Sequence, residues 1–513
     1  MPKGERMFFS NLFKSKPAMA KGEVLSTSLE ANLRRFKLDI FADNEIVMFR
    51  KFRSASPKPR ECVLIFNDYM AKHEFLSHYV LQPMMEKSIP ARLEGKKLVQ
   101  HIMNTIISAD GVDFQASIAE LTEAVLSGSG VVLIDGCDLG IVVDAQGWEK
   151  RKVSEPPTAN VVRGPRVGFT EELGVGLALL RRRIKCPSLK FRYFEVGTQT
   201  RTKVAISYIE GLASEKLVDE VITRIEEIEI DGVLDSGYIE ELIRDTPFTP
   251  LPTIGSSERP DVVAARLLEG RVAILVDGSP FALTVPHFFV ENFQASEDYY
   301  KNWINASFQR LLRYICFFLT TSTPALYLVL INYHPQLIPT ELVLSISAAR
   351  MAVPFPAVVE VTAMGLMFEI LREAGIRLPQ PIGDAISIVG AIVLGEAAVS
   401  ANLVSAPMII VVGVTGISGF ATPSLHGSAI IIRFILVILS SIFGLYGYLF
   451  GAVAFLLHLA TIHSFGAPYL TGYISFFPQD TKDTLLRAPW WGMLWRPRFL
   501  ATRNKVRMRD ARS

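Results

Sequence analysis

The apolar stretches that follow Tyr300 constrain the fold more than any other feature of this sequence. They are LLRYICFFLTTSTPALYLVLI, AISIVGAIVLGEAAVSANLV, MIIVVGVTGISGF and AIIIRFILVILSSIFGLYGYLFGAVAFLLHLA. A helix needs roughly 20 residues to cross a bilayer core of about 30 Å, so the first, second and fourth are long enough and the third is borderline. The fourth is either one long tilted helix or a hairpin broken at Gly444 or Gly447. We therefore predict an all-α, polytopic transmembrane domain over residues 300–470 and a cytoplasmic tail over residues 471–513.

Basic residues flank this domain on both sides. Lys301, Arg310 and Arg313 precede the first apolar stretch. The basic residues after the last stretch are Arg496, Arg498, Arg503, Lys505, Arg507, Arg509 and Arg512. Because Lys and Arg accumulate in cytoplasmic loops, we expect both termini in the cytoplasm and an even number of crossings.

Three tryptophans lie beside the arginines of the tail. They are Trp490, Trp491 and Trp495. Trp at such a position is typical of an anchor in the membrane interface, so membrane lipid is an expected partner. A nucleic-acid role for the basic tail is the weaker alternative, and the net charge of +2 gives it no support.

Before Tyr300, short apolar runs alternate with charged helical stretches such as EKLVDEVITRIEEIEIDG. This alternation is typical of a soluble α/β or α+β region. FFSNLF, at residues 8–13, is too short for the apolar core of a signal peptide, so we expect this region to stay in the cytoplasm. The 4 cysteines form no C-x-x-C pair, which argues against a zinc site and a disulfide framework and favours a reducing compartment.

Two ten-residue segments of the soluble region are nearly alike: SGSGVVLIDG at residues 127–136 and EGRVAILVDG at residues 269–278. One interpretation is a catalytic carboxylate at a strand end. The other is a hairpin, because a β-branched run that ends in Asp-Gly and is followed by further apolar residues is a strong hairpin signal. The residues of the two predicted turns are Asp135, Gly136, Asp277 and Gly278.

The spacing of the two segments favours the turn. Asp277 lies 142 positions after Asp135, and at the same offset IFNDYMAKHEFLSHYV from Ile65 overlies SYIEGLASEKLVDEVI from Ser207. Two separate segments in one register predict a tandem duplication of a strand, helix and hairpin unit. A turn that both copies need explains both aspartates, whereas one active site explains only one of them.

The predicted domain division follows from these patterns. It comprises a variable N-terminal segment at 1–55, cytoplasmic unit 1 at 56–148, a linker with an amphipathic helix at 149–200, cytoplasmic unit 2 at 201–295, and then the transmembrane domain and tail. In the linker, the arginines of LLRRRIKCP either bind phosphate or lipid headgroups or form a solvated, ion-paired face.

Motifs for catalysis and cofactor binding are missing from the sequence. It contains no G-x-x-x-x-G-K-[ST] or G-x-G-x-x-G loop and no G-x-S-x-G elbow. We therefore expect no enzyme activity, no cofactor and no metal site.

Several long blocks resemble the A-subunit family of bacterial spore germination receptors. They are GWEKRKVSEPPTANVVRGPRVGFTEELGVGLALLRRRIKCPSLK, DGVLDSGYIEELIRDTPFTPLPTIGSSERPDVVAARLLEGRVAILVDGSPF, VPFPAVVE, FEILREAGIRLPQPIG, SFGAPYL and KDTLLRAPWW. The resemblance extends in order from about Val63 to Trp491. It implies a multi-pass protein of the inner membrane of the dormant spore that works with a permease-like B subunit and a lipoprotein C subunit.

The resemblance further implies a homo-oligomeric ring, a pentamer, that forms a nutrient-gated ion channel and triggers germination. Two alternatives stay open. One is an accessory germination channel of the same family that acts downstream of the receptors. The other is a secondary transporter, which predicts inverted repeats and broken helices around a site at the bilayer midplane.

One predicted span, DAISIVGAIVLGEAAVS at residues 384–400, carries an acid inside its apolar run. At helical spacing Val389, Ile392, Val393 and Glu396 share one face, and small residues such as Gly395 and Ala398 share another. Because an intramembrane carboxylate is costly in lipid, we predict that the first face lines a pore, with the aliphatic side chains as its constriction and Glu396 as a ring that favours cations. The alternative is that Glu396 is a packing residue paired with Arg433 or the B subunit.

A charged segment, FEILREAGIRLPQPIG, lies between two apolar stretches. Glu369 and Arg372 are three positions apart, and Glu373 and Arg377 are four apart, so opposite charges meet on one helix face. We predict that this segment lies at the cytoplasmic interface and couples the soluble ring to the pore.

Overall fold

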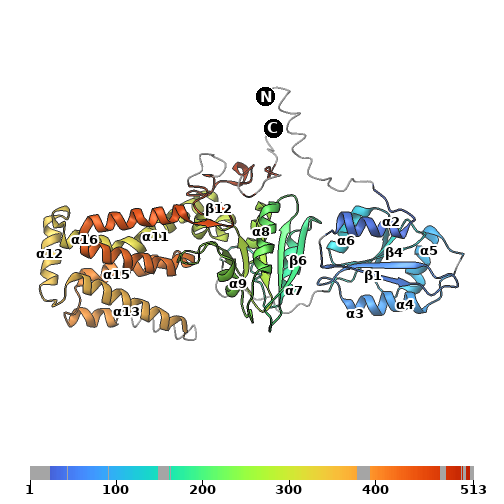
Figure 1. Cartoon of the computed structure of the whole chain (residues 1–513), viewed down its shortest axis with the longest axis horizontal. Coiled ribbons are helices and arrows are strands. Elements are labelled where there is room, and N and C mark those ends of the chain that lie inside the picture. Colours follow the sequence, from blue (N-terminus) through green and yellow to red (C-terminus); the bar gives the residue numbers. More distant parts are fainter. Residues whose placement is uncertain are drawn as a thin grey trace, which may run out of the picture. The chain divides into compact units, whose positions relative to one another are not determined.

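The computed structural model describes residues 23–42, 44–90, 92–147, 161, 163–377, 393–473, 481–497, 500 and 504–508 (Figure 1). The chain forms two compact units. The first, which we call the α/β unit, takes its described residues from 1–245, 254–286 and 490–513. The second, the helical unit, takes its residues from 246–253 and 287–489, so the chain enters it twice.

The α/β unit contains two five-stranded antiparallel sheets with the same strand order. The first sheet runs β1 (Val47–Arg53), β2 (Glu61–Asn67), β4 (Gly130–Ile134), β5 (Gly140–Val143), β3 (Val112–Gln115). The second runs β6 (Leu189–Val196), β7 (Thr202–Ile209), β9 (Val272–Val276), β10 (Ala282–Val285), β8 (Gly255–Ser257). Strands β9 and β10 begin and end 142 positions after β4 and β5, so the predicted soluble region of two duplicated units is confirmed.

Helices cover both faces of the first sheet (Figure 1). One face carries α2 (Leu29–Arg34), the π-helical turn η1 (Arg35–Ile40) and α6 (Ile118–Leu126). The other carries α3 (His73–Leu76), η2 (Ser77–Leu81), α4 (Gln82–Glu86), α5 (Gly95–His101) and η3 (Ile102–Ile106). Because side chains alternate along a strand, Val63 and Ile65 of β2 enter the first core and Leu64 and Phe66 enter the second.

The second sheet is accompanied by four helices. They are α7 (Leu173–Arg183), α8 (Glu215–Glu226), α9 (Ser236–Ile243) and α10 (Pro260–Glu269). Leu177 of α7 and Leu267 of α10 belong to the same core as Phe36 of η1 and Leu121 of α6. The two repeats therefore share one continuous apolar core.

Each repeat begins earlier in the structure than the sequence predicted. Strand β1 precedes the predicted boundary at residue 56, and both α7 and β6 lie within the predicted linker at 149–200. β1 and β6 are the edge strands of their sheets, each paired with a single neighbour within its sheet. An edge strand tolerates exposed charges, so VMFRKFR and LKFRYFEV lack the apolar run that marks a central strand.

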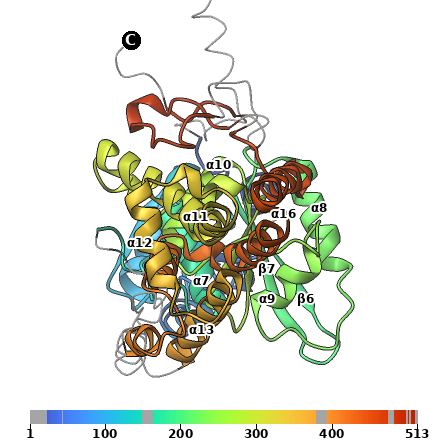
Figure 2. The same ribbon diagram turned by 90° about the vertical axis from the view of Figure 1, so that its left-hand side faces the viewer.

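The helical unit is built mainly from α-helices, which confirms the predicted class of the second region. They are α11 (Trp303–Asn332), α12 (Thr340–Arg350), α13 (Ala357–Arg377), a helix at residues 393–400, α15 (Ala406–Gly419) and α16 (His426–Thr461). Helix α11 packs against α15 and α16 (Figure 2). Among the described residues, two helical segments are long and apolar enough to cross a membrane, Trp303–Asn332 with a mean hydropathy of 1.7 and Pro423–Thr461 with 2.4.

Helix α16 reverses direction at Gly444. This glycine has φ 59° and ψ −136°, values that do not belong to a helix. A Cβ atom on Gly451 would lie 2.7 Å from Cδ2 of Leu436, although a straight helix would separate these two positions by about 22 Å. The segment is therefore a hairpin with two antiparallel arms, 426–443 and 445–461, which is one of the two arrangements that the sequence allowed.

Candidate functional site

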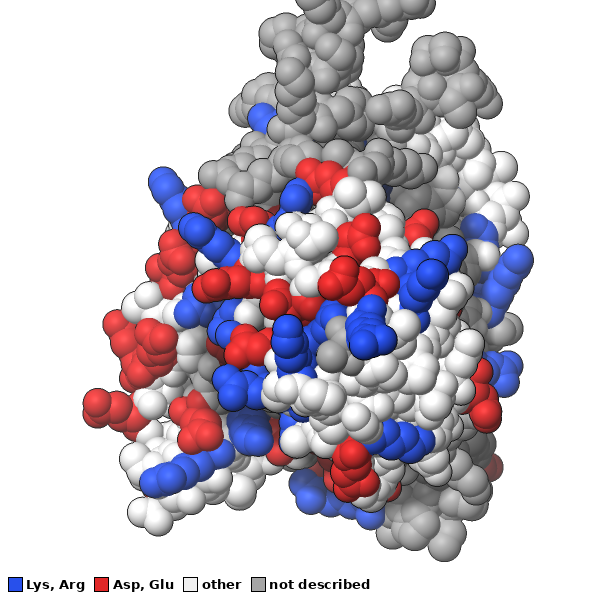
Figure 3. All heavy atoms as spheres, turned by 90° about the vertical axis from the view of Figure 1, so that its right-hand side faces the viewer, with Lys and Arg blue, Asp and Glu red and all other residues white. Residues whose placement is uncertain are grey.

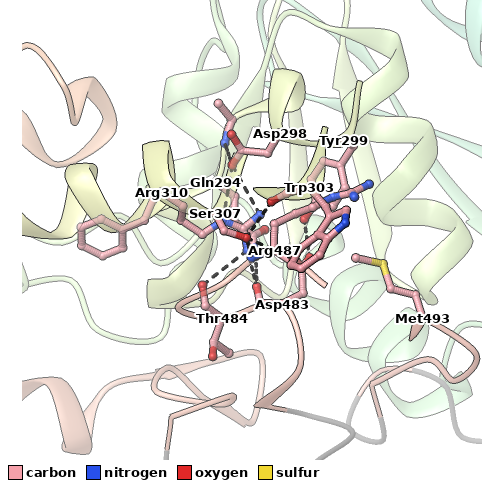
Figure 4. A network of polar contacts seen from close by, with 12 residues as sticks. Gln294, Asp298, Tyr299, Trp303, Ser307, Arg310, Asp483, Thr484, Arg487 and Met493 are labelled. Atoms are coloured by element: carbon pink, nitrogen blue, oxygen red, sulfur yellow. Dashed lines mark hydrogen bonds and ion pairs between the residues drawn. The ribbon is translucent and has the colours of Figure 1, made fainter. Parts of the chain in front are cut away.

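A buried network of charges joins the two ends of the helical unit (Figure 4). The Arg310 side chain, near the start of α11, is fully buried between two carboxylates. Its Nε lies 3.3 Å from Asp298 Oδ2, and its Nη1 lies 2.8 Å from Asp483 Oδ1. Arg313 adds a contact of 2.9 Å between its Nη2 and Asp298 Oδ1. We call these four residues the end clamp, because Asp298 precedes α11 and Asp483 follows the last helix.

Asp483 is held in an uncommon backbone conformation. Its φ is 68°, in the left-handed region that few residues other than glycine adopt. The Tyr299 hydroxyl donates to its Oδ2 over 2.6 Å, and Gln294 Nε2 donates to its carbonyl oxygen over 3.0 Å. Arg310 Nη1 donates to the same carbonyl oxygen over 2.6 Å. The end clamp therefore fixes the path of the chain where it leaves the helical unit.

The sequence indicated only half of the end clamp. Arg310 and Arg313 were expected as cytoplasmic flanking charges, and the structure pairs both with carboxylates of the protein. Their spacing of three positions places them on one face of α11. Asp483 lies inside the block KDTLLRAPWW, which carried the family resemblance but suggested no role, and no local pattern identified Asp298.

A second cluster of charges lies between α13 and α16. Glu369 Oε1 is 2.8 Å from Arg433 Nη2, and its Oε2 is 3.4 Å from Arg372 Nη1 and 3.6 Å from His426 Nε2. Three basic groups therefore surround one carboxylate. Arg433, which the sequence offered as a partner of Glu396, contacts Glu369 instead.

The other predicted pair of α13 lies at the surface. Arg377 Nη2 is 2.7 Å from Glu373 Oε1, and both side chains are largely exposed. The four residues predicted to couple the soluble ring to the pore thus fall into a partly buried pair, Glu369 and Arg372, and an exposed pair.

The predicted pore-lining face is only partly within the described residues. Val389 and Ile392 lie outside them, whereas Val393 is 56% exposed and Glu396 is also exposed. On the opposite side, Gly395 is buried and a Cβ atom there would lie 3.5 Å from Cδ1 of Ile409 in α15. The helix at 393–400 therefore packs through small residues and leaves the valine and the glutamate unburied.

The two Asp-Gly pairs lie in the β4–β5 and β9–β10 turns, where Gly136 and Gly278 have φ of 80° and 86°. The aspartates also serve a helix. The backbone N–H of Leu29 donates to Asp135 Oδ1 over 3.2 Å, and that of Leu173 donates to Asp277 Oδ1 over 3.1 Å. Each acceptor lies at the first residue of α2 or α7, where helical N–H groups lack partners. The sequence did not indicate this long-range cap.

The basic run in the predicted linker contains a structural arginine. Arg181 is fully buried and donates to the carbonyl oxygens of Cys186 and Leu189, each over 2.8 Å. Its guanidinium lies 4.9 Å from the centre of the Phe191 ring, and burial lowers the pKa of Arg181 to about 9. This residue holds β6 against α7, and because its side chain is fully buried a phosphate has no access to it.

The charged surface of the α/β unit gives no sign of a nucleic-acid site on the face that Figure 3 displays. Lys and Arg are interspersed with Asp and Glu among the described residues of that face (Figure 3), whereas nucleic-acid binding requires a continuous basic patch. Within the described part of the chain, no group of three or more His, Cys, Asp or Glu is placed to hold a metal ion.

Comparisons with known proteins cover both units. Residues 36–499 match a family described as Bacillus/Clostridium GerA spore germination protein. Spore germination protein KA of Bacillus subtilis (strain 168) is 40% identical over 486 residues, which are 94% of this chain and 89% of that protein. Spore germination protein GerLA of Bacillus cereus is 37% identical over 447 residues, 87% of this chain and 90% of that protein.

A solved structure is also similar. It is the N-terminal domain of the A subunit of the Bacillus megaterium spore germinant receptor GerK3, with 30% identity and a TM-score of 0.39. It covers 52% of this chain and 98% of that domain.

Proposed function

The chain belongs to the GerA family of spore germination proteins, and we propose that it is the A-type subunit of a nutrient-gated germinant receptor in the inner membrane of the spore. The observation that carries the proposal is the extent of the match. A relative named as a spore germination protein aligns with 94% of this chain and 89% of its own length, so the match extends over both the α/β unit and the helical unit.

The apolar surface of the helical unit supports a membrane location. On α16, Phe443, Tyr446 and Phe450 are 62%, 74% and 73% exposed. An exposed apolar surface of this kind is unfavourable in water and favourable in lipid. The two long apolar segments, Trp303–Asn332 and Pro423–Thr461, supply the length for several crossings.

The path of the chain supports termini on one side of the membrane. After the helical unit, the chain returns to the α/β unit that precedes it: Arg496 Nε donates to the carbonyl oxygen of Leu268 over 2.8 Å, and Arg507 Nη2 lies 2.6 Å from Glu269 Oε1. A chain that leaves a folded unit and later returns to it crosses a membrane an even number of times between the two points. With the positive flanks, this favours a cytoplasmic α/β unit.

The helix at 393–400 supports an oligomeric channel. Val393 and Glu396 are exposed in the single chain, although a carboxylate facing lipid would be costly. In a ring, proposed to be a pentamer, Val389, Ile392 and Val393 would form the constriction and Glu396 would place negative charge near its mouth. A permease-like B subunit and a lipoprotein C subunit complete the proposed receptor, which signals by ion release and not by catalysis.

Deletion of the gene tests the proposal. Spores without it should lose the response to one class of nutrient, measured as ion release and as the fall in optical density of the suspension, and a wild-type copy should restore it. An equal delay with every nutrient would indicate the accessory role instead. Unchanged germination with every nutrient tested would contradict both.

A further inference from the structure

The second repeat contains a segment that the first repeat uses differently. In the first repeat, α5 and η3 continue as a helix to Ile106, and Ile102 and Ile106 are buried against their own sheet. In the second repeat, α9 already ends at Ile243, and residues 246–253 form neither helix nor strand. The reason is local: this segment, TPFTPLPT, contains three prolines, which lack the N–H that a helix needs and clash with the preceding turn.

Residues 246–253 belong to the helical unit and not to the α/β unit around them in the sequence. We call them the docking segment. Leu251 is 1% exposed and lies in one apolar cluster with Phe289, Leu425, Leu459 and Tyr469. Full burial of one leucine side chain contributes about 1.5–3 kcal/mol, so this contact anchors the segment.

Four hydrogen bonds fix the docking segment along its length. The Ser428 hydroxyl donates to Pro250 O over 2.5 Å and the Tyr469 hydroxyl to Pro252 O over 2.7 Å. The other two are the Ser464 hydroxyl to Thr253 O at 2.7 Å and Thr249 Oγ1 with His458 Nε2 at 3.0 Å. Proline has no backbone N–H but keeps its carbonyl oxygen, so Pro250 and Pro252 can still accept hydrogen bonds.

These contacts reach both arms of the α16 hairpin. Ser428 lies at the start of the first arm, and His458 and Leu459 lie near the end of the second. Because the arms are antiparallel, these residues lie at the same end of the hairpin. The docking segment therefore holds the two ends of the hairpin together.

The docking segment is attached to the α/β unit at both ends. On its N-terminal side, Asp245 Oδ1 lies 2.5 Å from Arg224 Nη2 of α8. On its C-terminal side, Gly255 begins β8, which pairs with β10. Eight residues between two fixed points can extend by only about 3.3–3.6 Å per residue, so a rearrangement of α8, α9 or β8 pulls on the segment.

We propose that the docking segment, residues 246–253, is the coupling element that transmits rearrangements of the α/β unit to the α16 hairpin. The inference rests on the proposed function, in which a nutrient signal opens the helical unit. It assigns a regulatory role to Leu251, Thr249 and their partners on α16. In this mechanism the docking segment is displaced from α16, and no chemical group is transferred.

The test compares two buried residues of the full-length chain in spores. Leu251→Ala creates a cavity where the segment docks, and the response to nutrient per copy of the subunit should fall at least tenfold. Ile106→Ala is the matched control, because Ile106 is equally buried and lies 142 positions before Phe248, within the first repeat. Ile106→Ala should lower subunit abundance to an extent similar to Leu251→Ala and leave the response per copy within twofold of the wild-type response. A normal response of Leu251→Ala, or an equal loss in both variants, would overturn the inference.

Two further measurements keep the result interpretable. Thr249→Val and His458→Gln each remove one side of a hydrogen bond, so the double variant should respond like either single variant and not like the product of their effects. In the purified full-length protein, Leu251→Ala should speed hydrogen exchange of the backbone amides at both ends of α16. If a wild-type copy fails to restore the response of a deletion strain, the proposed function is wrong, and unchanged exchange in Leu251→Ala would independently refute docking.

Discussion

Arg310 and Asp483 are 173 positions apart in the sequence, and their side chains meet at 2.8 Å inside the helical unit. One of these residues lies where the chain enters its first long helix and the other where it leaves the unit. The contact therefore closes the unit with a charge pair in which Arg310 is fully buried and Asp483 is partly buried. Removal of one partner from such a pair leaves an uncompensated buried charge, which costs far more than the pair contributes.

Arg310→Met should destabilise the helical unit, by up to about 3–5 kcal/mol, because Asp483 loses Arg310 as its counter-ion and Asp298 keeps only Arg313. The measurement is the thermal midpoint of the protein in detergent. Arg377→Met is the control, since Arg377 pairs with Glu373 at the exposed surface, where an ion pair contributes little. Equal midpoints for the two variants would contradict the role assigned to the end clamp.

Glu369→Gln should lower the amount of folded protein in the membrane severalfold. The reason is that Arg372, Arg433 and His426 would lose the carboxylate that all three contact. Glu373→Gln changes an exposed glutamate of the same helix and should leave the amount unchanged. Immunoblots of membrane fractions compare the two. If Glu369→Gln accumulates normally and only the nutrient response changes, the cluster acts in coupling and not in packing.

Asp135→Asn and Asp277→Asn should cost less stability than Asp135→Ala and Asp277→Ala. Asparagine keeps the oxygen that accepts from the helix N–H and suits an Asp-Gly turn, whereas alanine removes the cap, at about 0.5–2 kcal/mol. Thermal midpoints of the four variants test the order. Complete loss of germination at normal abundance in either Asn variant would argue for a function beyond the turn.

Val393→Ala should widen the proposed constriction and give spores that lose ions without nutrient, and Val389→Ala and Ile392→Ala should do the same. Glu396→Gln should leave assembly intact and lower cation flux. Glu341→Gln, at an exposed position of α12, is the control for loss of an acid elsewhere in the unit. Tightly closed alanine variants, together with failed assembly of Glu396→Gln, would identify a packing helix.

Cysteine alkylation should discriminate between buried and exposed thiols. Burial raises the pKa of Cys62 from 9.0 to about 12, and Cys137 is also buried, whereas Cys186 is exposed. At pH 8 Cys186 should react at least about 100-fold faster than Cys62. Because the folded state keeps the Cys62 proton to higher pH than the unfolded state does, the free energy of unfolding should fall as the pH rises from about 9 to 12. Rapid labelling of Cys62 in the folded protein would contradict its place in the core.

The sequence alone determined the features that local patterns encode. Two similar ten-residue segments and a common offset of 142 positions identified the duplication, and the length and apolarity of segments such as Trp303–Asn332 identified the helical region. These signals are short-range, because strand and helix periods repeat within a few residues. The sequence placed the start of each repeat too late for the same reason: the charged edge strands β1 and β6 lack the apolar pattern that marks a strand.

Only the tertiary structure decided which distant residues meet. The sequence offered Arg433 as a partner of Glu396, but in the structure Arg433 contacts Glu369. Asp135 caps the helix that begins at Leu29, 106 positions earlier. Long-range pairs of this kind depend on how whole helices and strands pack. The residues next to a charged side chain in the sequence do not show which distant residue it will contact. The docking segment shows the same limit: the sequence analysis assigned it no role, and the fold decided that Leu251 packs within the helical unit.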